Sequence, residues 1–135
     1  MKWKEEVEKI LEEKAFLQSI NSGEEMKKYL ESYFENFFDL KEGKEFVEFT
    51  KSTNQIRLRI LDCELSVDCA GYKFYISYLE NGHHQLIGRI LIDEEKPMYR
   101  SNNSSSKTEF NEERLEEIFK KVFSPLRKSN NFSFS

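Results

Sequence analysis

The chain has 135 residues, a formal net charge of −4, and 12 Phe, 6 Tyr and 1 Trp, which together favour one folded domain with an aromatic core over a disordered chain. The acidic balance disfavours a nucleic-acid-binding protein and a protein that docks on anionic membranes, because both need a basic surface. Charged residues interrupt the apolar clusters, so neither a signal peptide nor a membrane-spanning helix is predicted, and we expect a cytoplasmic protein.

Two helices are predicted at the start of the chain. Residues 3–20 carry an apolar side at helical spacing, which Lys14 interrupts and which consists of Trp3, Val7, Ile10, Leu11 and Leu17. Ser22 and Glu25 form a capping-box pattern, which predicts a second helix from Gly23 to Leu40. The wide apolar stripe of this second helix consists of Met26, Tyr29, Leu30, Tyr33, Phe34, Phe37 and Phe38. The short connection favours an antiparallel helical hairpin.

Beyond Gly43 the period of the apolar pattern changes to 2, which predicts strands. The expected strands cover residues 45–51, 55–60, 63–69, 72–80, 83–92 and 96–101. Asn81-Gly82 between the fourth and fifth of them is a strong signal for a tight hairpin turn. Pro97 suits an edge strand, because proline has no N–H to donate to a neighbour. We therefore expect five or six strands in an antiparallel meander.

The last third of the chain predicts a loop and a helix. Residues 101–108 form a polar stretch that we expect to be a flexible loop within the domain. Asn111 is the expected N-cap of the final helix, with Phe110 and Leu115 as a hydrophobic staple, and Pro125 is expected to help end it. Residues 129–135 are expected to be a frayed tail. The chain is thus predicted as a single α+β domain, residues 1–128, with an N-terminal helical hairpin, a five- or six-stranded antiparallel meander sheet, and a C-terminal helix packed on the sheet.

Counting outward from a two-residue Asn81-Gly82 turn predicts the register of the hairpin. Ser77 is then opposite Leu86, Ile76 opposite Ile87, and Phe74 opposite Arg89. One face of the hairpin would carry Tyr72, Phe74, Ile76, Tyr78, Ile87 and Leu91. The other face would carry Tyr75, Leu79, Leu86, Ile90 and Ile92. Because both faces are apolar, we expect the C-terminal helix, a protein partner or a second copy to cover the second one.

Catalytic and metal-binding patterns are weak. His83 and His84 point to opposite faces of a strand, so one metal ion could not easily take both. They are expected to lie exposed at the hairpin tip. Cys63 and Cys69 share the parity of the core residues and are expected to be free, buried and inert thiols. We therefore expect no metal, no cofactor and no catalytic residue.

The residues that we single out as candidates for binding a ligand or a partner are Tyr29, Tyr33, Phe34, Tyr75, Tyr78, Leu86, Arg89 and Ile90. They support two hypotheses. The first is a non-enzymatic interaction module, comparable in type to small bacterial accessory proteins, that binds a protein partner or forms a homodimer. The second is a carrier or sensor of a small apolar ligand, with a pocket between the second helix and the sheet. An enzyme that uses His83 or His84 with a carboxylate ranks last.

Overall fold

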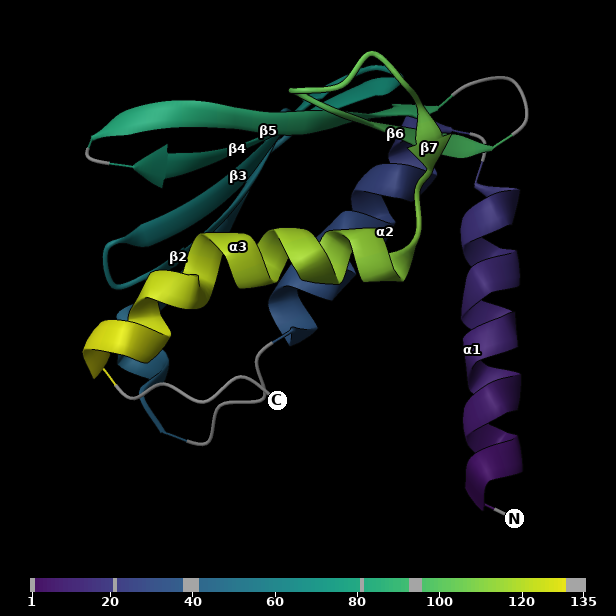
Figure 1. Ribbon diagram of the computed structural model, residues 1–135, viewed down its shortest axis with the longest axis horizontal. Helices are drawn as coiled ribbons and strands as arrows, with labels where there is room; N and C mark the ends of the chain where they lie inside the picture. The colour runs from purple at the N-terminus through teal and green to yellow at the C-terminus, as the bar shows by residue number, and fades with distance from the viewer. Residues whose placement is uncertain (1, 21, 38–41, 81, 93–95, 131–135) are drawn as a thin grey trace.

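The computed structural model describes residues 2–20, 22–37, 42–80, 82–92 and 96–130, which form helices and an antiparallel sheet (Figure 1). Two helices come first, α1 (Lys2–Ser19) and α2 (Gly23–Asn36), and a short 3-10 helix spans Lys44–Phe46. The strands are β1 (Val47–Lys51), β2 (Gln55–Ile60), β3 (Cys63–Ala70), β4 (Lys73–Glu80), β5 (His83–Ile92), β6 (Pro97–Ser101) and β7 (Thr108–Glu109). The last helix is α3 (Glu112–Asn130).

The seven strands of the described residues pair in chain order, β1-β2-β3-β4-β5-β6-β7. The predicted α+β class, the meander and the C-terminal helix are thus confirmed, whereas the prediction of five or six strands is wrong. The strand that was missed, β7, has two residues, too few to show any alternation, and it pairs Thr108 with Tyr99 and Glu109 with Met98. β7 therefore takes the edge of the sheet in place of β6.

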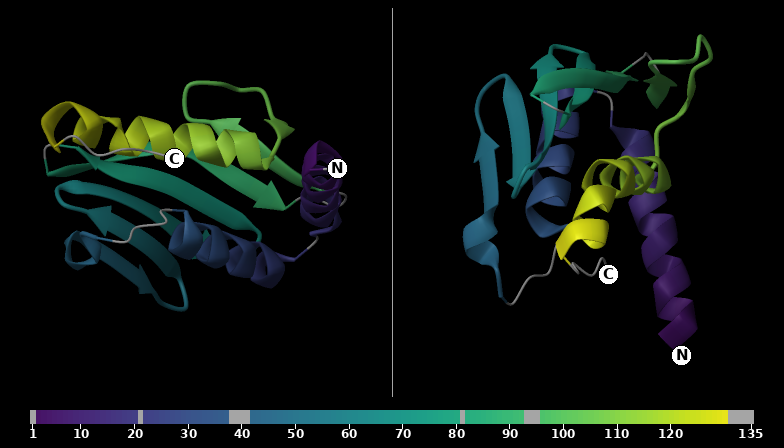
Figure 2. Two further views of the ribbon diagram at one scale, coloured as in Figure 1. Left: turned by 90° about the horizontal axis from the view of Figure 1, so that it is seen from below. Right: turned by 60° about the vertical axis from the view of Figure 1, so that its left-hand side comes forward.

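α2 and α3 lie side by side on one face of the sheet, which we call the core face (Figure 2). The hydrophobic core lies there, between the apolar stripes of the two helices and the alternate strand residues that point toward them. The largest side chains that are fully buried are Ile20, Met26, Leu30, Phe34, Ile56, Leu58, Ile60, Leu65, Phe74, Phe110, Phe119 and Phe123. Burial of this apolar area drives the fold.

α1 is an exception to this packing. A short connection joins it to α2, as predicted, yet α1 extends away from the rest of the molecule (Figure 1). Among its described side chains only Leu17 is buried. The two helices therefore do not pack along their lengths as an antiparallel hairpin would.

The helix caps were predicted correctly, and one helix end was not. The Ser22 hydroxyl accepts the N–H of Glu25 at 3.2 Å, and the Asn111 side chain accepts the N–H of Arg114 at 2.8 Å. α3 continues through Pro125 to Asn130. Proline removes one helical hydrogen bond, and the carbonyl of Lys121, its usual acceptor, instead accepts the Ser124 hydroxyl at 3.2 Å. The predicted end of α2 at Leu40, the turn residue Asn81 and the tail from residue 131 lie outside the described residues.

The predicted register of the β4–β5 hairpin is correct near the turn and wrong beyond it. Leu86 is opposite Ser77 as predicted, but Gly88, not Ile87, is opposite Ile76. Ile87 is thus an extra residue in β5, a β-bulge. Beyond it Ile90, in place of Arg89, is opposite Phe74.

This bulge changes which residues share a face. Ile90 and Ile92 turn to the core face and are buried there, whereas Arg89 turns to the outer face beside Tyr75. The predicted assignment of residues to the two faces is therefore wrong beyond the bulge, where Leu91 also turns to the outer face, opposite Lys73. Tyr75, Leu79 and Leu86 stay on the outer face.

Neither α2 nor α3 covers the outer face (Figure 2). Two polar residues of β3 are nevertheless buried there, Glu64 and Ser66. Glu64 lies 3.7 Å from the guanidinium of Arg57, and the Ser66 hydroxyl shares a hydrogen bond of 3.0 Å with Ser77. Cross-strand side chains of the sheet thus satisfy polar groups at the centre of this face.

Replacing Gly88 with Ala is expected to destabilise the fold, because the added Cβ would lie 2.7 Å from the carbonyl oxygen of Arg100. A backbone atom of a paired strand cannot move aside easily, so we expect the free energy of unfolding to fall by about 1–3 kcal/mol in urea titrations. Gln85→Ala, an exposed change on the same strand, is the control and should have little effect. Equal stability of the two variants would contradict the close packing of β5 on β6.

Candidate functional site

α1 exposes an apolar stripe that contributes little to the core of its own chain. The exposed fractions are 62% for Trp3, 46% for Val7, 62% for Ile10 and 60% for Leu11. At 100° per residue these side chains lie on one side of the helix, and that side continues through Lys14 to the buried Leu17. We call this side the α1 stripe. Residues 3, 7, 10, 14 and 17 alternate in steps of four and three, as in the seam of a coiled coil.

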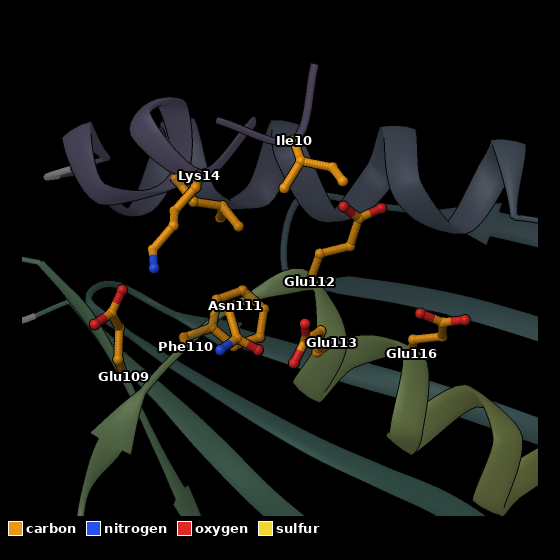
Figure 3. Close-up of a pocket in the computed structure, with 9 residues that line it drawn as sticks. Ile10, Lys14, Glu109, Phe110, Asn111, Glu112, Glu113 and Glu116 are labelled. Carbon is orange, nitrogen blue, oxygen red and sulfur yellow. The ribbon is translucent and has the colours of Figure 1, made fainter. Parts of the chain in front are cut away.

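The C-terminal end of the α1 stripe forms one wall of a groove of about 440 Å³. Ile10 and Lys14 reach into it from α1, and the start of α3 lies opposite (Figure 3). The residues that line the groove are Ile10, Lys14, Leu17, Glu109, Phe110, Asn111, Glu112, Glu113 and Glu116. Phe110 and Leu17 are themselves almost completely buried, so the accessible walls are Ile10, the lysine and the carboxylates.

The groove is negatively charged. Four carboxylates, on Glu109, Glu112, Glu113 and Glu116, come from β7 and the first two turns of α3. Carboxylates are favourable at a helix N-terminus because of the helix dipole. Two of these carboxylates are paired with lysines outside the groove: Lys96 lies 3.5 Å from Glu109, and Lys120 lies 3.5 Å from Glu116.

These carboxylates change the pKa of a nearby tyrosine. Burial raises the pKa of the Tyr33 hydroxyl well above its usual value, and the negative charges of Glu112 and Glu116 raise this pKa further. Their field disfavours another anion close by, and it would stabilise a cation that enters the groove. A lysine or arginine on an apolar segment therefore matches this surface better than an acidic segment.

The three predicted site residues of α2 pack against rings of α3 and of Phe110, which precedes α3, instead of lining a cavity. Phe34 and Tyr33 pack edge-on against Phe119, with ring centroids 4.9 and 5.2 Å apart. Tyr29 packs edge-on against Phe110 at 6.5 Å. Rings at these distances and angles are typical of a well-packed core.

The five predicted site residues of the sheet do not come together. Tyr75, Leu86 and Arg89 lie on the outer face, whereas Ile90 is fully buried on the core face. Tyr78 is half-buried on the core face, where its hydroxyl donates a 2.9 Å hydrogen bond to Glu80. The sheet thus separates Arg89 from the α2 rings that were expected to share its pocket.

Sequence reasoning noticed the α1 stripe and Lys14 within it, but missed the groove. The groove joins α1 to residues almost a hundred positions later in the chain. The only local signal was the lysine, since a charged residue in the middle of an apolar stripe is unusual for a core helix.

The two histidines lie at the start of β5. His83 and His84 are exposed, as expected. The described residues contain no group of three or more His, Cys, Asp or Glu side chains placed to hold a metal ion, and none of their helices is long and apolar enough to cross a membrane.

Comparisons with protein families, with curated proteins and with solved structures find no match to this chain. The site must therefore be interpreted from its own geometry.

Phe34→Ala tests whether the α2 rings belong to the core. We expect the free energy of unfolding to fall by about 3–5 kcal/mol, because the substitution leaves a cavity beside Phe119. Phe46→Ala removes an aromatic ring that is half-exposed and should cost much less in the same urea titrations. A small effect of Phe34→Ala, similar to that of the control, would instead indicate a preformed pocket at these rings.

The two thiols are expected to react slowly in the folded protein. Cys63 is buried and Cys69 half-buried. Burial is the largest effect on both, and it raises the pKa of Cys69 from 9.0 to about 11. The neutral thiol therefore contributes stability that is present below pH 9 and is lost as the pH rises through 11.

Alkylation by iodoacetamide at pH 8 should accordingly be much slower in the native protein than in urea, where both thiols are exposed. Mass spectrometry of the alkylated peptides resolves Cys63 from Cys69. Native alkylation as fast as alkylation in urea, at either cysteine, would show that this thiol is not protected.

Proposed function

We propose that this protein is a non-enzymatic interaction module that binds a protein partner, or a second copy of itself, through α1. The observation that carries this proposal is the exposure of the α1 stripe. A helix of a folded protein, such as α1 with its 18 residues, gains most of its stability when its apolar face packs against another surface. Trp3, Val7 and Ile10 face solvent in this structure, and a contiguous apolar surface of this kind is typical of a binding site.

The other two hypotheses have less support. A carrier of apolar ligands needs free volume beside α2, where aromatic rings pack on α3 at 4.3–5.2 Å. An enzyme needs a polar group placed against a substrate, and His83 and His84 lie exposed on a strand. We further propose that the protein acts in the cytoplasm, where its two thiols stay reduced, and that it binds neither nucleic acid nor membranes.

A triple substitution on the α1 stripe tests the proposed function. Val7→Gln, Ile10→Gln and Leu11→Gln together remove the apolar surface while keeping good helix formers. These side chains are exposed, so the fold should remain stable. We expect wild-type protein to form a complex, either with itself or with one partner protein from which the complex can be reconstituted. The triple variant should not form this complex. Sedimentation velocity of the purified protein, and of the protein in native extract, measures this.

The matched control carries Glu5→Gln, Glu8→Gln and Glu12→Gln. These residues are exposed on the opposite side of the same helix. The control thus also introduces three glutamines into α1, but it leaves the α1 stripe intact and should keep the complex. If wild type and both variants sediment as monomers in both conditions, the proposed function is wrong.

A further inference from the structure

We propose that the partner of α1 is a second copy of this chain, with the two α1 helices antiparallel and Trp3 of each copy seated in the groove of the other. The inference rests on the proposed function and names its partner. It also assigns a site, the groove between α1 and α3, and the residue of the second copy that occupies it.

The α1 stripe and the groove are continuous, which makes such a pairing geometrically simple. Ile10 belongs to both, since it is part of the stripe and also lines the groove. Two helices that cross antiparallel at Ile10 place residue 3 of one level with residue 17 of the other. Trp3 of the second copy then reaches the end of the groove at Lys14, whose ammonium group points into it (Figure 3).

Trp3 cannot reach this position within its own chain. Eleven residues separate it from Lys14, which corresponds to about 16 Å along a helix that rises 1.5 Å per residue. The N-terminal half of α1 points away from the sheet and from α3 (Figure 1). A groove at one end of the stripe and an exposed indole at the other therefore complement each other only between two copies, as in a two-fold symmetric interface.

The charged side chains around Trp3 bear on the arrangement. Lys2 and Lys4 are exposed beside Trp3 at the start of α1, and the exposed Glu5 and Glu6 follow them. Glu5 points away from the α1 stripe. In an antiparallel pair the two lysines approach the carboxylates of the other copy's groove, and Glu6, which flanks the stripe, is level with the other copy's Lys14. A parallel pair would bring Lys2 and Lys4 together with their own counterparts, and each acidic groove close to the other. Like charges at an interface disfavour the wrong arrangement and opposite charges fix the register.

Lys14 has a role in this arrangement. It occupies the one polar position of the seam formed by residues 3, 7, 10, 14 and 17, where a single lysine specifies the register of a helix pair at some cost in stability. In the antiparallel pair it lies near the indole of the second copy's Trp3. An ammonium group close to an aromatic ring is attracted by the ring's electrons.

The available area is enough for a reversible dimer. Trp3, Val7, Ile10 and Leu11 together expose on the order of 400 Å² of apolar side chain, about half of the ~800 Å² that each partner buries in a standard interface. The lysines at the start of α1 and the groove walls add polar area at the rim. We therefore expect a dimer that dissociates on dilution.

Trp3 is the only tryptophan of the chain, so its fluorescence reports on the proposed contact directly. We expect the emission of wild-type protein to shift to longer wavelength, and quenching by iodide to increase, as the protein is diluted through the dimer-to-monomer transition seen by sedimentation equilibrium. A dimer in which Trp3 remains as accessible to iodide as in the monomer would overturn the assignment of the groove.

Trp3→Ala is expected to raise the dissociation constant of the dimer at least about tenfold, as for an aromatic anchor at an interface. Tyr72→Ala is the matched control, because Tyr72 is an aromatic residue of nearly equal exposure, 64% against 62%, on the turn between β3 and β4. Both variants should unfold at the same urea concentration as the wild-type protein. An unchanged dissociation constant for Trp3→Ala would contradict the proposal.

A charge swap distinguishes the antiparallel pair from other dimers. Lys2→Glu with Lys4→Glu, and separately Glu113→Lys with Glu116→Lys, should each weaken the dimer, and the four substitutions together should restore it. Absence of restoration would overturn the proposed contact between these groups.

The failures of the two proposals are distinguishable. If purified wild-type protein stays monomeric at all concentrations, but the α1 triple variant alone loses a complex with a different protein, then the second-copy inference is wrong and the proposed function stands.

Discussion

The contact between α2 and α3 is the constraint on which the rest of the structure depends. The ring centroid of Phe119 lies 4.9 Å from that of Phe34 and 4.3 Å from that of Phe37, so one residue of α3 packs against the last turn of α2 and against its C-cap residue. This cluster holds both helices side by side on the core face of the sheet (Figure 2). α1 contacts α2 near the C-terminal end of α1, where the ring centroid of Phe16 lies 6.4 Å from that of Tyr29. The rest of α1 extends away (Figure 1).

The elements that could be predicted from the sequence are those specified by local patterns. The alternation of residues 55–60 predicted β2, the gapless stripe around Phe119 predicted α3, and Asn111 predicted the cap that starts it. The direction of α1 could not be predicted, because a short connection to the next helix is compatible with both a packed hairpin and a diverging pair. It depends on which partner α2 prefers, and that partner lies at the other end of the chain.

The sheet shows how one residue can change a predicted surface. Counting from the turn was correct up to Leu86, and the extra residue Ile87 then moved Ile90 to the core face and Arg89 to the outer face. A bulge has no reliable pattern in a single sequence, since it depends on how two strands fit over the core. The outer face thus loses Ile90 and Ile92 and gains Arg89 and Leu91. The exposed apolar residues of α1 therefore form a clearer candidate for a binding surface than the sheet does.

The position of Lys14 indicates that the α1 stripe is a surface between two chains and not part of the hydrophobic core of one chain. A lysine amine in the middle of a buried stripe would lose its hydration without compensation. At the mouth of an acidic groove it keeps both water and carboxylates within reach (Figure 3). The same groove can accept the lysines and the indole at the start of a second α1. A helix with an exposed indole and two lysines at its start, and an acidic groove at its end, can complement a second copy in the antiparallel orientation, which is the property that a symmetric dimer requires.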